Sequence, residues 1–169
     1  HPGNSSEHTH LVVWSRSQPR GRGAPAGATF AKLAPLDEHS APGIRFFSGI
    51  ATYSRKFTAP RGWKPGRPLW VDLGEVGDLA QVSVNGEDVG TVWHAPYRVN
   101  VANAAKPGGN LLIVRVANLW VNRLIGDAQA GAAQVTWTAI PTYLKEAPLR
   151  RSGLIGPVTL LSSGYTAHR

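Results

Sequence analysis

Short runs in which apolar and polar residues alternate recur along the chain from about residue 28 onward. In the run LAQVSV (79–84) and in the run LLIVRV (111–116), every second residue is apolar, as on a strand that buries one face. Turn-forming residues separate these runs. The pattern predicts strands at residues 28–33, 51–57, 68–73, 79–84, 88–93, 97–101, 110–117, 135–138 and 157–161, with a shorter candidate at 11–14.

The turn residues favour an antiparallel arrangement of these strands. Asn85-Gly86 lies between two alternating runs and predicts a two-residue hairpin, because both central positions of the favoured turn need a positive φ. No segment of ten or more residues has a helical period; the one candidate, 128–133, is short and contains Gly131. A parallel α/β sheet would need helical crossovers. The sequence therefore predicts an all-β sandwich of two antiparallel sheets.

Composition bounds the organisation of the chain. With 169 residues it has the size of one domain, and its 19 glycines and 13 prolines suit many short strands. We expect a polar and basic, partly flexible leader at 1–27, the sandwich at 28–163 and a tail at 164–169. The polar opening HPGNSSEHTH shows no methionine and no signal peptide, so we expect an excised or processed piece of a longer protein.

The charge and the apolar content limit the classes of partner. The net charge is +8, but most basic residues are scattered rather than gathered on one element, so we expect no nucleic acid partner. No apolar run approaches the roughly 20 residues of a membrane helix, so we expect no membrane partner. The absence of cysteine excludes disulfides and thiolate metal sites.

Five motifs carry a resemblance to a known family. They are FFSGIATYSRKF (46–57), LWVDLGEVGDLAQVSVNGEDVGTVWHAPYRVNV (69–101), NLLIVRVANLWVNRLIGD (110–127), TWT (136–138) and SGLIGPVTLL (152–161). Their order resembles the C-terminal β-sandwich of glycoside hydrolase family 106, the α-L-rhamnosidases. It is more distantly similar to the N-terminal sandwich of glycoside hydrolase family 2. The resemblance covers residues 28–163 and implies a galactose-binding-domain-like jelly roll from a secreted or periplasmic enzyme.

The same resemblance places the catalytic carboxylates in a separate (β/α)-barrel. Such a barrel needs roughly 250 residues and repeated βα units, and this chain has neither. We therefore expect no hydrolase activity from this domain alone. The expected partners are a carbohydrate, with rhamnose- or uronate-containing glycans favoured, and the catalytic barrel of the parent chain.

Aromatic and amide residues near strand ends are the candidates for sugar recognition. Trp120 stands close to two amides and a guanidinium, groups that suit the apolar face and the hydroxyls of a sugar. Either Asp127 faces a ligand, or it pairs with Arg123 and fixes the loop. The tryptophans could instead plug the ends of the core. The predicted sugar-binding residues are Trp93, Tyr97, Asn118, Trp120, Asn122, Arg123 and Asp127.

The remaining aromatic and acidic residues give weaker indications of function. Trp63 and Trp70 are expected to pack in the core, and most carboxylates lie at turns. One structural calcium ion held by loop oxygens is an expectation for sandwich domains of this type, although no contiguous acidic loop is present.

These observations predict a non-catalytic carbohydrate-binding or accessory domain of an exo-acting glycoside hydrolase. The alternatives are a purely structural domain that packs on a catalytic barrel and, more remotely, a stand-alone glycosidase.

Overall fold

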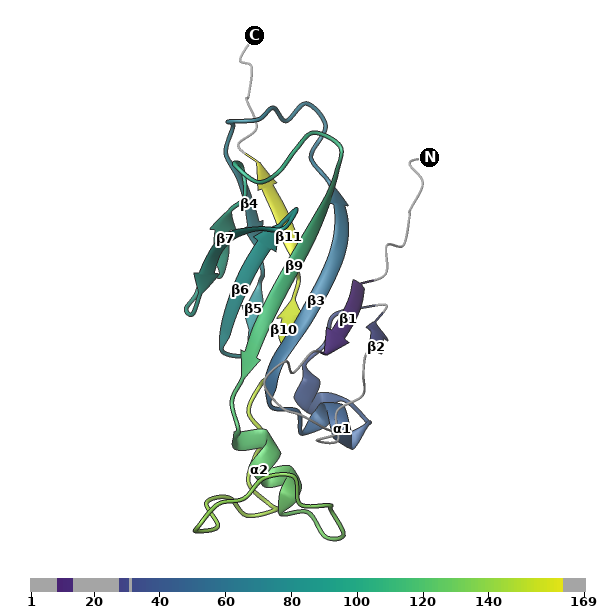
Figure 1. The fold of residues 1–169 in the computed structure, drawn as a ribbon, viewed down its shortest axis with the longest axis vertical. Coiled ribbons are helices and arrows are strands. Elements are labelled where there is room, and N and C mark those ends of the chain that lie inside the picture. The colour runs from purple at the N-terminus through teal and green to yellow at the C-terminus, as the bar shows by residue number, and fades with distance from the viewer. Residues whose placement is uncertain (1–8, 14–27, 31, 163–169) are drawn as a thin grey trace.

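The computed structural model describes residues 9–13, 28–30 and 32–162. Two layers of antiparallel strands enclose the core (Figure 1), as the strand pattern predicted. One layer is a six-stranded sheet in the order β2-β1-β3-β9-β6-β7. The other consists of the three-stranded sheet β11-β4-β8 and the two-stranded sheet β10-β5. The elements are β1 (Thr9–Val13), β2 (Ala28–Phe30), η1 (Leu36–Glu38), α1 (Pro42–Arg45), β3 (Gly49–Thr58), β4 (Leu69–Asp72), β5 (Glu75–Val76), β6 (Leu79–Val84), β7 (Glu87–Val92), β8 (Arg98–Asn100), β9 (Gly109–Asn118), α2 (Val121–Asp127), β10 (Leu154–Gly156) and β11 (Thr159–Ser162).

The long antiparallel pair β3–β9 is the centre of the larger sheet. It is in register along its whole length, from Gly49 opposite Asn118 to Thr58 opposite Gly109. On β6, the alternating residues Ala80, Val82 and Val84 are fully buried. Burial of one face of each strand is what pins this register, because a slip by one residue would turn every apolar side chain to solvent.

The second layer is one interrupted ladder. Gly156 pairs with Glu75 and Thr159 pairs with Asp72, so these two pairs share one register, which shifts at an irregularity between Leu154 and Gly156. The interruption lies at Gly74, whose φ is +67° and where a Cβ atom would stand 2.5 Å from the carbonyl carbon of Gly156. Only glycine fits this close approach of two backbones.

The predicted hairpin at Asn85-Gly86 is confirmed. Both residues have positive φ, 54° and 89°, and they join β6 to β7. The Asn85 amide group also donates to Ala104 O at 2.8 Å and to Asn110 Oδ1 at 2.9 Å. This turn therefore holds the neighbouring loop as well as the hairpin.

Two local predictions are wrong. Residues 135–138 form no strand, and residues 121–127 form a helix that the sequence did not indicate. The backbone N–H groups of Val135 and Thr136 donate to the carboxylate of Asp127 rather than to a neighbouring strand. Helix α2 has seven residues, too few to display a helical period.

The segment expected to be a leader contributes strand β1, which pairs with both β2 and β3. The rest of the expected leader, 1–8 and 14–27, lies outside the described residues, as do Trp14, residue 31 and the tail from 163 onward.

Tyr53 links the two layers. Its buried hydroxyl accepts a hydrogen bond from Leu154 N at 3.0 Å, and burial, partly offset by that bond, raises its pKa to about 12. Tyr53→Phe leaves a buried N–H without its acceptor, so we expect a loss of about 1–3 kcal/mol in the free energy of unfolding in urea. Tyr143→Phe is the matched control, because no described residue bonds that hydroxyl. A similar loss in both variants would contradict the assignment.

The raised pKa has a pH consequence of its own. The unfolded chain ionises Tyr53 near its usual pKa of about 10, so its contribution is complete below that pH. The contribution is lost as pH rises toward the folded value of about 12. In urea titrations above pH 10, we expect the free energy of unfolding to fall more steeply for the wild type than for Tyr53→Phe.

Candidate functional site

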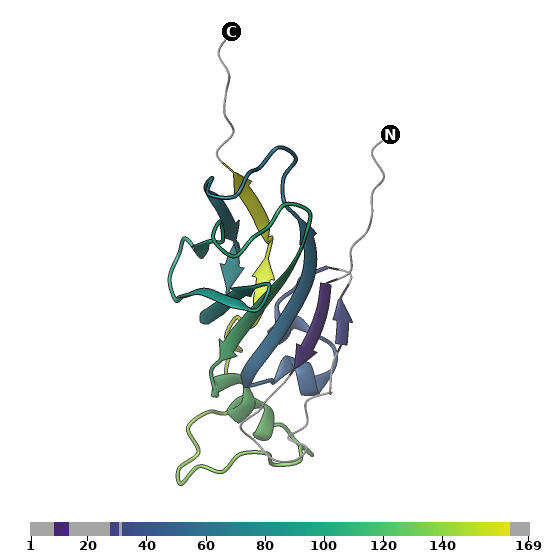
Figure 2. The same ribbon diagram turned by 45° about the horizontal axis from the view of Figure 1, so that its top comes forward.

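Helix α2 and the irregular segment 128–150 extend from one end of the sandwich (Figures 1 and 2). They follow directly from the last residue of β9, Asn118. Asn118 is buried; its side-chain amide donates to Gly49 O and Val116 O, both at 3.1 Å. Its Oδ1 atom accepts from Gly153 N at 2.7 Å. Asn118, which was predicted to contact a sugar, therefore joins the end of β9 to the backbone at Gly153.

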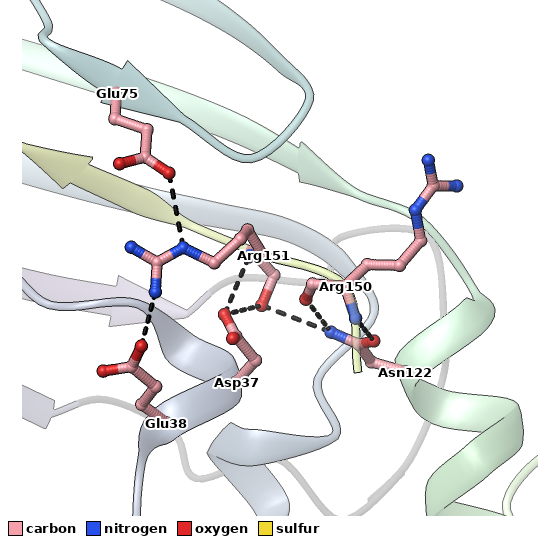
Figure 3. A network of polar contacts seen from close by, with 7 residues as sticks. Asp37, Glu38, Glu75, Asn122, Arg150 and Arg151 are labelled. Carbon is pink, nitrogen blue, oxygen red and sulfur yellow. Dashed lines mark hydrogen bonds and ion pairs between the residues drawn. The ribbon is translucent and has the colours of Figure 1, made fainter. Parts of the chain in front are cut away.

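Asn122 has a similar position on α2. Its Nδ2 atom donates to Arg150 O at 2.7 Å, and its Oδ1 atom accepts from Arg150 N at 2.8 Å, so one side chain pairs with both backbone groups of that residue. Asp37 Oδ1 accepts from Ser152 N at 2.9 Å (Figure 3). We call residues 150–154 the seam, because polar side chains from four elements hold its backbone.

The Arg151 side chain strengthens the seam on its exposed side. Its guanidinium pairs with Glu38 of η1 and, through Nε at 3.3 Å, with Glu75 of β5 (Figure 3). All three side chains are about half exposed, so each pair is a weak contribution to stability.

Asp127, at the end of α2, binds both the helix and the segment that follows it. Its Oδ1 atom pairs with Arg123 Nε at 3.0 Å and Nη2 at 2.9 Å. Its Oδ2 atom accepts from Thr136 N at 2.7 Å, Thr136 Oγ1 at 2.5 Å and Val135 N at 3.2 Å. The expected ion pair that fixes the loop is thus present. Burial alone would raise the Asp127 pKa, but the bonds from Thr136, the charge of Arg123 and the bond from Val135 together lower it.

These contacts shape an open hollow of about 500 Å³ beside α2. This volume lies in the range of about 300–1,000 Å³ that small-molecule sites occupy. Trp120 is 54% exposed and Trp137 is 79% exposed, so neither ring is part of the core. The residues that line the hollow are Trp120, Gln134, Val135, Thr136 and Trp137.

The other predicted loop lies elsewhere. Trp93 and Tyr97 follow β7, the edge strand of the larger sheet, and that loop lies beside the sandwich rather than at the α2 end (Figure 1). Trp93 is 66% exposed, and its ring meets the His94 ring edge-on at 5.8 Å. Tyr97 packs partly buried against the core. The alternative that Trp93 or Trp120 plugs the core is wrong.

The structure thus gathers five of the seven predicted residues around α2, including Asp127, but separates their roles. Asn118, Asn122 and Arg123 are buried, whereas Trp120 faces the hollow. The predicted site residues did not include Trp137, Thr136 or Gln134, all of which line the hollow. The signal for Trp137 was the TWT motif, which was interpreted as a strand.

Within the part of the chain that the structure describes, no three histidine or carboxylate side chains lie together as a metal site. The calcium ion stays a prediction. No helix among the described residues is long and apolar enough to cross a membrane.

Comparisons with known proteins place this fold in a functional context. No protein-family model matches the chain. A solved rhamnosidase from Novosphingobium sp. PP1Y is 57% identical with a TM-score of 0.84, over 91% of this chain and 14% of that one. A protein of Formosa agariphila named "Putative beta-glucuronidase" is 37% identical over 143 residues, and the match covers 70% of this chain and 12% of that protein.

A more distant likeness concerns the fold alone. A β-glucuronidase from an uncultured Clostridium sp. has a TM-score of 0.53 at 21% identity, over 67% of this chain and 21% of that one. The fold and these likenesses define a β-sandwich domain of the type found in glycoside hydrolases. Within that class the chain resembles a rhamnosidase sandwich, which confirms the resemblance that the motifs carried. The chain spans 14% of the length of that rhamnosidase.

Asp127→Ala tests whether the Asp127 carboxylate stabilises α2 and the segment that follows it. The substitution leaves the buried Arg123 charge and two N–H groups without their acceptor, so we expect a loss of about 3 kcal/mol in the free energy of unfolding. Amide exchange at Thr136 should also accelerate. Glu146→Ala, which removes an exposed pair with Lys145, should change stability by less than about 1 kcal/mol. Equal losses in the two variants would show that Asp127 has no special role.

Proposed function

We propose that this chain is a non-catalytic accessory domain of an exo-acting, α-L-rhamnosidase-like glycoside hydrolase, and that it binds a sugar in the hollow between Trp120 and Trp137. The observation that carries the proposal is the exposure of two indole rings on one hollow whose wall also offers an amide and a hydroxyl. The similarity to a rhamnosidase supports a rhamnose-containing plant or bacterial polysaccharide. The net charge of +8 favours chains that also bear uronates.

The chemistry of the hollow suits a pyranose ring. The C–H face of a sugar packs on an indole ring, while the Gln134 amide bonds hydroxyl groups and Thr136 Oγ1, whose hydrogen is donated to Asp127, can still accept from one. In this arrangement Asn122, Arg123 and Asp127 act indirectly, because their polar atoms hold α2 and the segment that carries Trp137.

The pKa shifts of Asp72 and Asp127 argue against a catalytic role for either carboxylate. Asp72 accepts from Gly74 N and Arg98, and these bonds lower its pKa despite partial burial; the pKa of Asp127 is lowered as well. A glycosidase acid needs the opposite, a carboxyl whose pKa is raised so that it carries a proton near neutral pH. The proposed domain therefore supports a catalytic barrel supplied elsewhere in the parent protein.

Isothermal titration against rhamnose, rhamnogalacturonan and a neutral glycan tests the sugar site. We expect millimolar or tighter binding of a rhamnose-containing ligand, weakened about tenfold by Trp137→Ala through the lost aromatic contact. Trp93→Ala, which changes another exposed tryptophan that does not line the hollow, is the control and should bind as the wild type does. No heat of binding with any of these glycans would reject the proposal.

A second candidate role is docking on the parent's catalytic domain. Leu119, Ile140 and Leu144 are exposed in the same region as the two tryptophans of the hollow. Exposed apolar side chains gathered in one region are typical of surfaces that another domain covers. A wall that contacts a barrel can also contact the substrate bound there, so the two roles are compatible.

The docking role predicts binding in trans. The Novosphingobium rhamnosidase, prepared without the region that this chain matches, should bind the chain in analytical ultracentrifugation. Leu144→Asp should weaken that complex strongly, because a charge in an apolar contact is desolvated without a partner. Lys64→Asp changes the charge at an exposed position of another loop and should leave the complex intact. If the two variants bind equally well, α2 and its loop are not the docking surface.

A further inference from the structure

The outer face of the three-stranded sheet β11-β4-β8 carries an exposed tryptophan, although Trp70 was expected to pack in the core. On β4, Leu69 and Val71 point inward and are fully buried. Because successive side chains of a strand point to opposite faces, Trp70 and Asp72 lie on the outer face. Trp70 is 40% exposed there.

The strand register places four more side chains on this outer face. Trp70 stands opposite Asn100 of β8 and Leu161 of β11. Residues directly opposite each other on neighbouring strands share a face and lie within contact range. One row across the sheet therefore contains an aliphatic side chain, an indole ring and an amide.

The second row lies two residues further along β4. Asp72 stands opposite Arg98 of β8 and Thr159 of β11. Together the two rows make a patch that we call the Trp70 face. It consists of Trp70, Asp72, Arg98, Asn100, Thr159 and Leu161.

Hydrogen bonds hold the polar groups of the Trp70 face in fixed directions. Asp72 Oδ1 accepts from Gly74 N at 2.9 Å, and its Oδ2 accepts from Arg98 Nε at 2.7 Å. That bond uses one edge of the guanidinium, and among the described residues neither Nη group of Arg98 meets an acceptor. Asp72 thus orients the guanidinium of Arg98 and leaves its two Nη groups available as donors.

Asn100 is oriented in the same way. Its Oδ1 atom accepts from Ala102 N at 3.0 Å, while its Nδ2 group meets no acceptor within the described part of the chain. The patch accordingly presents a flat aromatic ring beside amide and guanidinium N–H donors whose other atoms are already held. Preorganised donors lose little entropy when a ligand accepts their hydrogen bonds.

This combination fits a sugar better than a protein. A stable protein interface buries about 800 Å² on each side and needs a cluster of apolar anchors. The Trp70 face has only two large apolar side chains, and its remaining members are polar. A pyranose ring needs one aromatic surface for its C–H face and donors for its hydroxyl or carboxylate oxygens, which are the groups present.

We propose that the Trp70 face is a second glycan-binding site, which holds one pyranose residue of a polysaccharide independently of the hollow beside α2. Trp70 stacks on the ring, and Arg98 and Asn100 donate to its oxygen atoms. An acidic sugar and a neutral one offer the same ring, and they differ in whether a carboxylate or a hydroxyl accepts from Arg98.

The test follows the indole N–H signals of the full chain by two-dimensional NMR. The chain has six tryptophans, so Trp70→Phe identifies the Trp70 signal among six. The wild type is titrated with tri-galacturonate as the acidic probe and with methyl α-L-rhamnoside and methyl β-D-galactoside as neutral probes, each to tens of millimolar. We expect at least one probe to shift the Trp70 indole and Arg98 Nε–H signals in a saturable manner.

Variants separate this site from the hollow. Trp70→Ala and Arg98→Ala should each weaken the binding by about tenfold or more, and since both side chains are exposed the fold should remain intact. Trp137→Ala should leave the shift of Trp70 unchanged. Arg115→Ala, which removes an exposed arginine from the opposite layer, is the control for lost charge.

Each result decides one of the two sites. A Trp70 signal that stays in place with all three probes overturns this inference, even when the Trp137 signal moves and the hollow is supported. A Trp70 shift that survives in Arg98→Ala at wild-type affinity also overturns it. A saturable Trp70 shift without any response of Trp137 supports the inference and leaves the hollow without support.

Discussion

The arrangement of the α2 end depends on how the backbone of the seam is hydrogen-bonded. Asp37, Tyr53, Asn118 and Asn122 come from η1, β3, β9 and α2, and each accepts a backbone N–H of residues 150–154. A buried N–H that loses its acceptor costs about 1–3 kcal/mol, so these bonds are expensive to break. One short segment therefore joins both layers of the sandwich to the helix.

This anchoring explains how an irregular segment can hold the proposed binding surface in one arrangement. Between α2 and the seam the chain forms no strand, yet Asp127 holds its first part through Thr136, and Gln129 Nε2 bonds Ile125 O and Lys145 O at 3.0 Å. The polar side chains lie at the base, and Trp137 and its apolar neighbours remain outside. A surface held in this way suits recognition of a sugar, of another domain, or of both together.

The strand prediction succeeded where burial of one face controls structure, as on β6 and β9, and at the Asn85-Gly86 turn. The ring of Trp120 is exposed on the hollow, and its contact with a sugar stays a prediction. The site prediction grouped Asn118 and Asn122 with that ring because amides bind sugar hydroxyls. Both amides instead bind buried backbone groups, which a chain must satisfy before any ligand arrives.

The sequence by itself determined the sandwich class and the main strands, because alternation and turn residues act over short distances. Its motifs separately carried the likeness to rhamnosidases. Only the tertiary structure decided which polar side chains form hydrogen bonds within the protein. Asp127 and Thr136 are nine residues apart, and Asn118 and Gly153 are 35 apart, so no local pattern reveals those bonds. The outward position of Trp70 likewise depended on which face of β4 meets the core.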